Sequence, residues 1–194
     1  MKQDQNEMIN ELERIVETCR QQVVDFRGVD VNLLQHKSSA GSWSVLECIE
    51  HLNMYGDFYL PEMEKSLSGA KPARNAEFKS GMLGGYFAKL MKVGADGKMT
   101  KMKAPTDKNP VSGELSPVVL DRFIKQVDML LGLLERARRV DLAGAKTPIT
   151  LSKWIRLSLG DTFRFNVFHI ERHVKQAGRA LAAGEKSVPV RTMA

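Results

Sequence analysis

Three histidines in the sequence have the residue type and the spacing of metal ligands. His169 and His173 are four residues apart near the end of the chain. On an α-helix, side chains four apart lie on the same face, so these two imidazoles can reach one divalent ion together. His51 is the best candidate for a third ligand, because it lies on another periodic segment that can pack beside the first. Three neutral imidazoles leave a fourth position open for water or substrate, as in catalytic zinc sites.

The alternative interpretation is that two histidines four apart are ordinary residues at the edge of a helical core. A polar stripe borders the apolar stripe of the last helix, and it contains Thr162, Asn166, His169, His173 and Gln176. This stripe predicts a half-buried ligand pair. Neutral imidazoles also need neighbours that fix their tautomers, and the candidates near in sequence are Glu47, Glu50, Asp57, Asp161 and Asn166. The sequence does not choose among them, and His36, in a polar loop, is expected to be exposed.

The segment His169–His173 differs by one position from the His-Glu-x-x-His motif of metalloproteases. Its acidic residue is Glu171, which lies about 200° around a helix from His169. The carboxylate therefore points away from the metal and cannot serve as the general base of that protease class. A peptidase of this type is excluded.

Other side chains near His51 have two interpretations each. Cys48 would be a fourth ligand or a thiol near the metal, although such a cysteine is more often a small core residue. Tyr55 and Tyr59 would donate a hydrogen bond to a substrate, although core packing with a satisfied hydroxyl is commoner. We expect Trp43 and Trp154 to pack at helix starts, with the lining of a substrate cleft as the alternative.

The spacing of apolar residues predicts four long amphipathic helices. The first covers about residues 5–26, and the second begins at the Ser44 and Glu47 capping box and reaches Pro61, which kinks or ends it. The third covers 116–138, with Ser116 as its cap. The last begins near Thr150 or Ser152, is loosened at Gly160 and ends at Gly184.

Outside these four helices, we expect little regular structure. A short helix is expected within residues 80–92, where three glycines weaken it, and residues 93–116 are expected to be irregular. We find no credible strand pairs. The sequence therefore predicts an all-α, antiparallel four-helix bundle, a fold that places metal sites on facing helices. One domain over residues 1–194 is expected, with a core at about 5–184 and a poorly ordered tail at 185–194.

Composition excludes several classes of protein. Two cysteines in 194 residues provide no disulfide framework, which indicates a reducing compartment. No segment approaches the roughly 20 apolar residues of a membrane helix, and the N-terminus lacks a signal core, so we expect a soluble cytoplasmic protein. The net charge of +6 suggests nucleic-acid binding, but the basic residues cluster little and no nucleic-acid motif is present. Those on the last helix, Arg164, Arg172, Lys175 and Arg179, are expected mostly on its solvated side.

Three short motifs, in this order and separation, resemble the DinB-like superfamily of four-helix-bundle metalloenzymes, which includes YfiT-like proteins and bacillithiol transferases. They are Trp43–Glu47 leading to Glu50–Leu52, then Lys101–Pro105, and finally Phe168–Gln176. The resemblance covers about Leu12 to Leu181. It implies a divalent metal, commonly nickel or zinc, held by His51, His169 and His173, with water completing the shell.

The resemblance leaves the reaction open, because a shared fold does not transfer a substrate. Our leading hypothesis is transfer of a low-molecular-weight thiol such as bacillithiol, in which the metal deprotonates the thiol for attack on an electrophilic carbon. Arg156, Arg164 and Lys103 are candidate contacts for the carboxylates of such a thiol. The first alternative is a metal-dependent hydrolase, which would need a well-placed base. The second is a non-catalytic bundle that binds metal or a partner helix, and a homodimer through a helix face is compatible with any of these.

Overall fold

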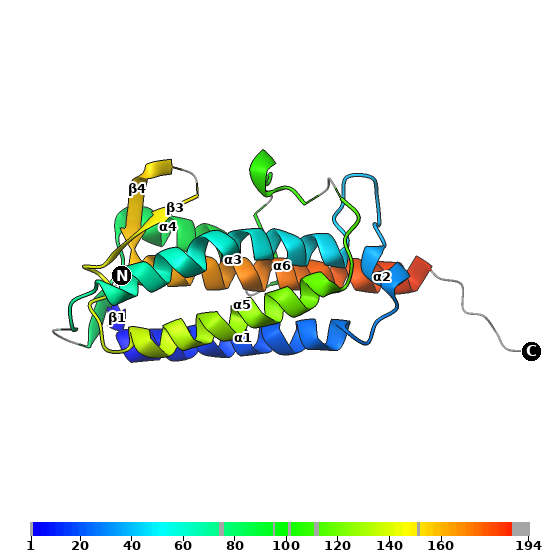
Figure 1. Cartoon of the computed structure of the whole chain (residues 1–194). Helices are drawn as coiled ribbons and strands as arrows, with labels where there is room; N and C mark the ends of the chain where they lie inside the picture. Colours follow the sequence, from blue (N-terminus) through cyan, green and yellow to red (C-terminus); the bar gives the residue numbers. More distant parts are fainter. Residues whose placement is uncertain are drawn as a thin grey trace, which may run out of the picture.

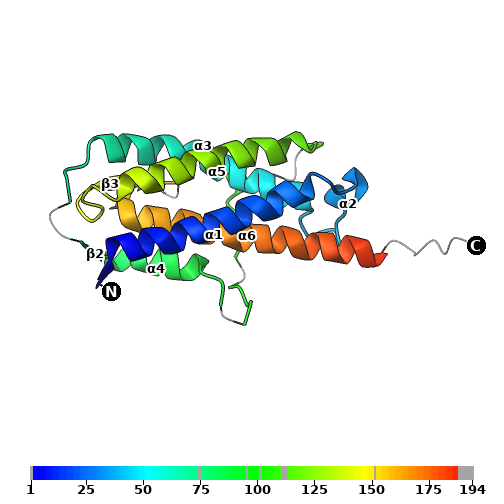
Figure 2. The same cartoon turned by 90° about the horizontal axis from the view of Figure 1, so that it is seen from below.

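The computed structural model describes residues 2–73, 76–94, 96–100, 102–110, 113–150 and 152–187. Its frame consists of four long helices, α1 (Gln5–Phe26), α3 (Val45–Ser68), α5 (Val118–Ala137) and α6 (Leu159–Ser187). Both α1 and α3 pack against α5 and α6, so α1 and α3 lie diagonally across the bundle. Figures 1 and 2 show α1 and α6 running in one direction and α3 and α5 in the other. The predicted all-α four-helix bundle is confirmed.

The first helix has the bounds that its apolar pattern predicts. Its buried residues, among them Leu12, Val16 and Val23, recur at steps of three and four. The side chain of Asp4 accepts a hydrogen bond from the backbone N–H of Glu7 at 2.9 Å, which satisfies one of the free donors at the helix start. The short helix α2 (Val31–Gln35) follows and leads toward α3.

The helix that carries His51 begins at the predicted capping box. Ser44 Oγ accepts a hydrogen bond from the backbone of Glu47, and the Glu47 carboxylate accepts one from the Ser44 backbone N–H. The helix continues through Pro61 to Ser68. Pro61 removes one N–H from the helical ladder without ending the helix.

A long connection joins α3 to α5. It contains β2 (Glu77–Lys79), α4 (Met82–Met91) and the 3-10 turn η1 (Thr106–Lys108), so the predicted short helix within 80–92 is confirmed. In the described part of residues 93–116, η1 is the one regular element. Pro117 has helical backbone angles (φ −57°, ψ −12°), as predicted for a proline at the first helical position, and it makes no side-chain capping hydrogen bond. The backbone carbonyl of Ser116 accepts a hydrogen bond from the Val119 N–H at 3.2 Å.

The prediction that the chain has no strand pairs is wrong. β1 (Lys2–Asp4) pairs with β2, and β3 (Lys146–Ile149) pairs with β4 (Ser152–Ser158), both antiparallel. The last helix therefore begins at Leu159, not near Thr150 or Ser152, because pairing with β3 overrides the helical pattern. At its other end α6 passes Gly184 and reaches Ser187, so it includes the start of the predicted tail, whose residues 188–194 lie outside the described part.

Gly160, which we expected to loosen the last helix, lies in the first turn of α6. A Cβ atom at this position would come within 2.4 Å of the Phe78 ring on β2. Phe78 is 1% exposed, so the ring cannot easily move away. The glycine therefore lets β2 pack closely against the start of α6. None of the described helices combines the length and the apolar character that crossing a membrane requires.

Candidate metal centre

The structure brings the three predicted ligands together. His51 comes from α3, whereas His169 and His173 come from α6, and these helices pack side by side (Figure 1). One ligand atom of each histidine lies within 4.8 Å of the other two. The Nε2 atoms of His51 and His169 are 3.2 Å apart. That these histidines bind a metal stays a prediction, but their meeting point is now defined.

Burial keeps all three imidazoles neutral. His51 and His169 are 2% and 4% exposed, and His173 is partly buried. Desolvation is the main cause that lowers the pKa of His51, to about 4. Desolvation followed by the charge of a neighbouring histidine lowers the pKa of His169 and of His173 well below the ordinary value. A neutral imidazole is the form that binds a metal.

Hydrogen bonds orient two of the three rings. The backbone carbonyl of Lys108 lies 2.6 Å from His51 Nδ1, so we assign the ring proton to Nδ1 and the free lone pair to Nε2. Gln176 Oε1 is 3.0 Å from His173 Nδ1 and has the same effect. His169 Nδ1 is buried and has no hydrogen-bond partner among the described residues.

The four acidic residues that we considered as tautomer-fixing partners have other contacts, and Asn166 lines the small internal cavity that His169 also borders. Glu47 belongs to the α3 cap and an ion pair with Lys37, while Glu50 and Asp57 both bind Arg122. Asp161 is buried among Ser80, Ser158 and Arg164. Gln176 is the residue that fixes the tautomer of His173. It lies three residues after His173, and this spacing is a local signal that the sequence already contained.

The donor set fits a divalent ion such as zinc. Zn–N bonds of about 2.0–2.1 Å in a tetrahedral shell place two nitrogen ligands about 3.3 Å apart, close to the 3.2 Å between His51 Nε2 and His169 Nε2. The same separation suits a hydrogen bond between two neutral imidazoles. Glu171 is not part of the group, and it forms an ion pair with Lys175.

The histidines open onto a cavity of about 440 Å³. One side, here called the helical wall, belongs to α3, α6 and Trp43, which lies two residues before α3. It consists of Trp43, His51, Tyr55, Phe165, His169, Arg172, His173 and Gln176. The opposite side, the loop wall, consists of Met102, Lys103, Ala104, Pro105 and Asn109. None of the described residues that line this cavity is an aspartate or a glutamate.

Aromatic rings surround the histidine cluster. The Trp43 ring centroid is 4.7 Å from that of His51, and the Tyr55 ring centroid is 4.4 Å from that of His169. Burial is the main cause that raises the pKa of the Tyr55 hydroxyl to about 12, so it remains protonated at neutral pH. Trp43 packs at the start of α3, as predicted, and it also lines the cavity.

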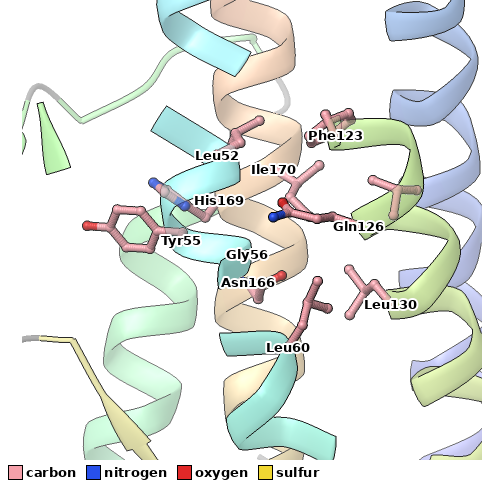
Figure 3. Close-up of a pocket in the computed structure, with 11 residues that line it drawn as sticks. Leu52, Tyr55, Gly56, Leu60, Phe123, Gln126, Leu130, Asn166, His169 and Ile170 are labelled. Carbon is pink, nitrogen blue, oxygen red and sulfur yellow. The ribbon is translucent and has the colours of Figure 1, made fainter. Parts of the chain in front are cut away.

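His169 also borders a much smaller cavity inside the bundle. This space has a volume of about 10 Å³, close to what one water molecule needs. Figure 3 shows that its labelled lining residues come from α3, α5 and α6, and they include Leu52, Gly56, Leu60, Phe123, Leu130, Asn166 and Ile170. His169 therefore separates a polar cavity from the apolar core.

Several residues that we considered for the site lie elsewhere. Cys48 is fully buried in the core, and burial raises the pKa of its thiol to about 12; it is not part of the histidine group. The Tyr59 hydroxyl accepts a hydrogen bond from the Thr150 backbone at 3.3 Å, so its predicted structural role is confirmed.

The prediction for Trp154 is wrong, because this residue lies on β4 and is 94% exposed. His36 is partly buried beside Gly184, not exposed.

Of the three predicted cationic contacts, only Lys103 lines the cavity. Arg164 binds Asp161 and Ser80, and Arg156 borders a separate pocket beside α4. The residue that we missed is Arg172, which was expected on the solvated side of the last helix but is 7% exposed and lines the cavity. Its burial depends on the segment that contains Thr100, whose position no helical pattern predicts.

Comparison with known proteins agrees with the geometry. The family model of the DinB superfamily matches residues 15–177, which is most of the chain and includes all three histidines. Neither a curated protein nor a solved structure matches the chain. Residues 102–105 of the middle motif lie on the loop wall, whereas Lys101 is outside the described residues. The chain belongs to the DinB superfamily.

Proposed function

We propose that this protein is a metal-dependent transferase that joins a low-molecular-weight thiol to an electrophilic carbon. The observation that carries the proposal is three neutral, buried imidazoles that converge beside a cavity with no acidic lining residue among those described. His51, His169 and His173 would hold one nickel or zinc ion. When bound, this ion supplies a Lewis acid that lowers the pKa of a thiol.

The residues around the ion prepare the site for this chemistry. The Lys108 carbonyl and the Gln176 side chain hold two imidazoles with Nε2 toward the common point, so little reorientation is needed on metal binding. Trp43 and Tyr55 cover the sides of the His51 ring and limit the access of water. The Tyr55 hydroxyl stays protonated at neutral pH and so remains a hydrogen-bond donor.

The lining of the cavity favours a transferase over a hydrolase. A hydrolase that activates water benefits from a carboxylate or another base near the metal, and the described lining provides no aspartate or glutamate. A purely structural metal site would be closed by a fourth protein ligand. Here the group contains three histidines and opens onto about 440 Å³, which supports substrate binding.

The test is thiol conjugation by protein purified without a histidine tag and loaded with zinc or nickel. Bacillithiol and glutathione are each incubated with monochlorobimane, beside a panel of esters and amides without thiol. We expect thiol-dependent conjugation by the parent and by His36→Ala, in which the histidine outside the cluster is changed, and no conjugation by His169→Ala. Hydrolysis of esters or amides without thiol, lost in the same variant, would replace the transferase with the hydrolase.

A further inference from the structure

Arg172 is a buried cation with no buried anion beside it. It is 7% exposed, and the described part of the chain contains no ion pair to its guanidinium. Nη2 donates to the backbone carbonyl of Thr100. Nη1 is buried and has no hydrogen-bond partner among the described residues. Burying an arginine is costly, because the desolvation of its charge must be offset by hydrogen bonds or an ion pair, and the described residues provide one hydrogen bond.

Among the described residues, the lining of the cavity beside Arg172 is positive and contains no carboxylate to balance this charge. Lys103 lies at its exposed rim, and the described lining contains no carboxylate. Arg179, one of the neighbouring cations on α6, is exposed and contacts Met99, so it adds positive charge nearby. A divalent ion on three neutral histidines would add two more charges. An anionic ligand is therefore the partner that this cavity lacks.

We propose that the cavity binds a small molecule that carries a carboxylate, and that Arg172 is the residue that recognises this group. The proposal rests on the proposed function, because it names the class of substrate that enters the same site. The planar guanidinium matches a carboxylate through two parallel hydrogen bonds. Nη1 has no hydrogen-bond partner among the described residues, so it is the donor left for the ligand once the guanidinium turns toward the cavity. Lys103, which also lines the cavity, adds attraction. The thiol or the electrophile then carries an acid group that sets its orientation relative to the histidines.

Arg172 has one alternative role, which is to brace the segment at Thr100 through the Nη2 hydrogen bond. A bracing residue would affect the binding of every ligand alike. A recognition residue affects only ligands that carry the carboxylate. The two roles are separated by probes that differ in this group alone.

The experiment uses four probes on the zinc-loaded protein, namely 3-mercaptopropionate, 2-mercaptoethanol, propionate and inorganic phosphate. The chain has two tryptophans, so a Trp154→Phe background leaves Trp43, at the cavity wall, as the fluorescent reporter of binding. We expect 3-mercaptopropionate to bind about tenfold more tightly than 2-mercaptoethanol, the size expected for hydrogen bonds to a charged group. This preference disappears in Arg172→Gln. It persists in Arg179→Gln, the matched control that removes an equal charge from α6 outside the cavity lining.

Each outcome decides one question. Equal binding of the two thiols by the parent protein overturns the carboxylate site and leaves the thiol function standing. Equal binding of 3-mercaptopropionate and propionate, still dependent on Arg172, supports the carboxylate site and overturns the thiol function. Competition by phosphate that exceeds competition by propionate overturns the carboxylate in favour of a phosphate ligand. A preference that survives Arg172→Gln assigns Arg172 to bracing and overturns its recognition role.

The proposal remains testable where Arg172→Gln does not fold. Arg172→Lys keeps the positive charge and removes the planar pair of donors, so we expect it to fold and to lose most of the preference for the carboxylate. A preference unchanged in this variant would overturn recognition by the guanidinium. Propionate titrations repeated on metal-free protein should show the same dependence on Arg172, because the contact does not involve the metal.

Discussion

The two walls of the cavity differ in how they are held and in what they provide. The helical wall presents the three histidines from α3 and α6, and two of these side chains are almost fully buried. The loop wall presents Met102 and Lys103, which are exposed, and a neighbouring segment contributes backbone carbonyls at Thr100 and Lys108. The difference teaches that the packed bundle positions the three candidate metal ligands, whereas the connection between α3 and α5 forms the other side of the cavity.

The hydrogen bonds between these regions run mainly from helix side chains to loop backbone. His51 Nδ1 and Arg172 Nη2 both use carbonyl groups of the connection. A backbone acceptor does not depend on the side chain at that position, so substitutions at Thr100 or Lys108 leave the two acceptors in place. Changes to the helical wall should therefore have larger effects on the metal than changes to the loop wall.

The largest expected effect is the pH dependence of the metal-free protein. The pKa of His51 is about 4 in the fold against 6.5 ordinarily, so the unfolded chain binds more protons in this window, and stability falls as the pH drops from 6.5 to 4. His51 alone accounts for about 3 kcal/mol over this range, and His169 and His173 act in the same direction. Urea unfolding at pH 7.5 and pH 4 measures the loss. In His51→Ala the loss should shrink; an unchanged loss would contradict the neutral, buried state of this ring.

A smaller effect is expected from the residue that orients His173. Gln176→Leu keeps the approximate size of the side chain and removes the acceptor at His173 Nδ1, so metal affinity should fall by roughly tenfold, the lower range for loss of an orienting partner. Lys103→Gln on the loop wall should leave metal affinity unchanged. Competition with a chelator of known affinity measures both variants. Equal losses in the two variants would remove the distinction between the walls.

The sequence predicted the helical wall because helical spacing specifies a face. The spacing of four positions from His169 to His173, and a capping box that begins seven residues before His51, placed both helix surfaces toward one core. The helical spacing of the apolar residues also predicted the four-helix bundle. What the pattern could not provide was the contact of His51 with the Lys108 carbonyl, because 57 residues separate the pair and most of the intervening connection has no periodic signal.

The errors have a shared physical cause, which is contact between segments distant in sequence. β4 became a strand because β3 is available to pair with it, although its residues also fitted the start of a helix. Arg172 looked solvent-exposed on a helical wheel, and the connection that covers it lies about 70 residues earlier in the chain. His36 is covered by α6 near Gly184. Local patterns describe which face a residue occupies, and they do not describe which loop later covers that face.

The most direct test of the central claim is the metal content of protein purified without a histidine tag, measured by plasma mass spectrometry. We predict about one equivalent of zinc or nickel in the parent and in His36→Ala, and little metal in His51→Ala with the helical fold retained by circular dichroism. Metal-free parent protein that also fails to take up added zinc or nickel would contradict the account and leave three histidines that only hydrogen-bond within a bundle.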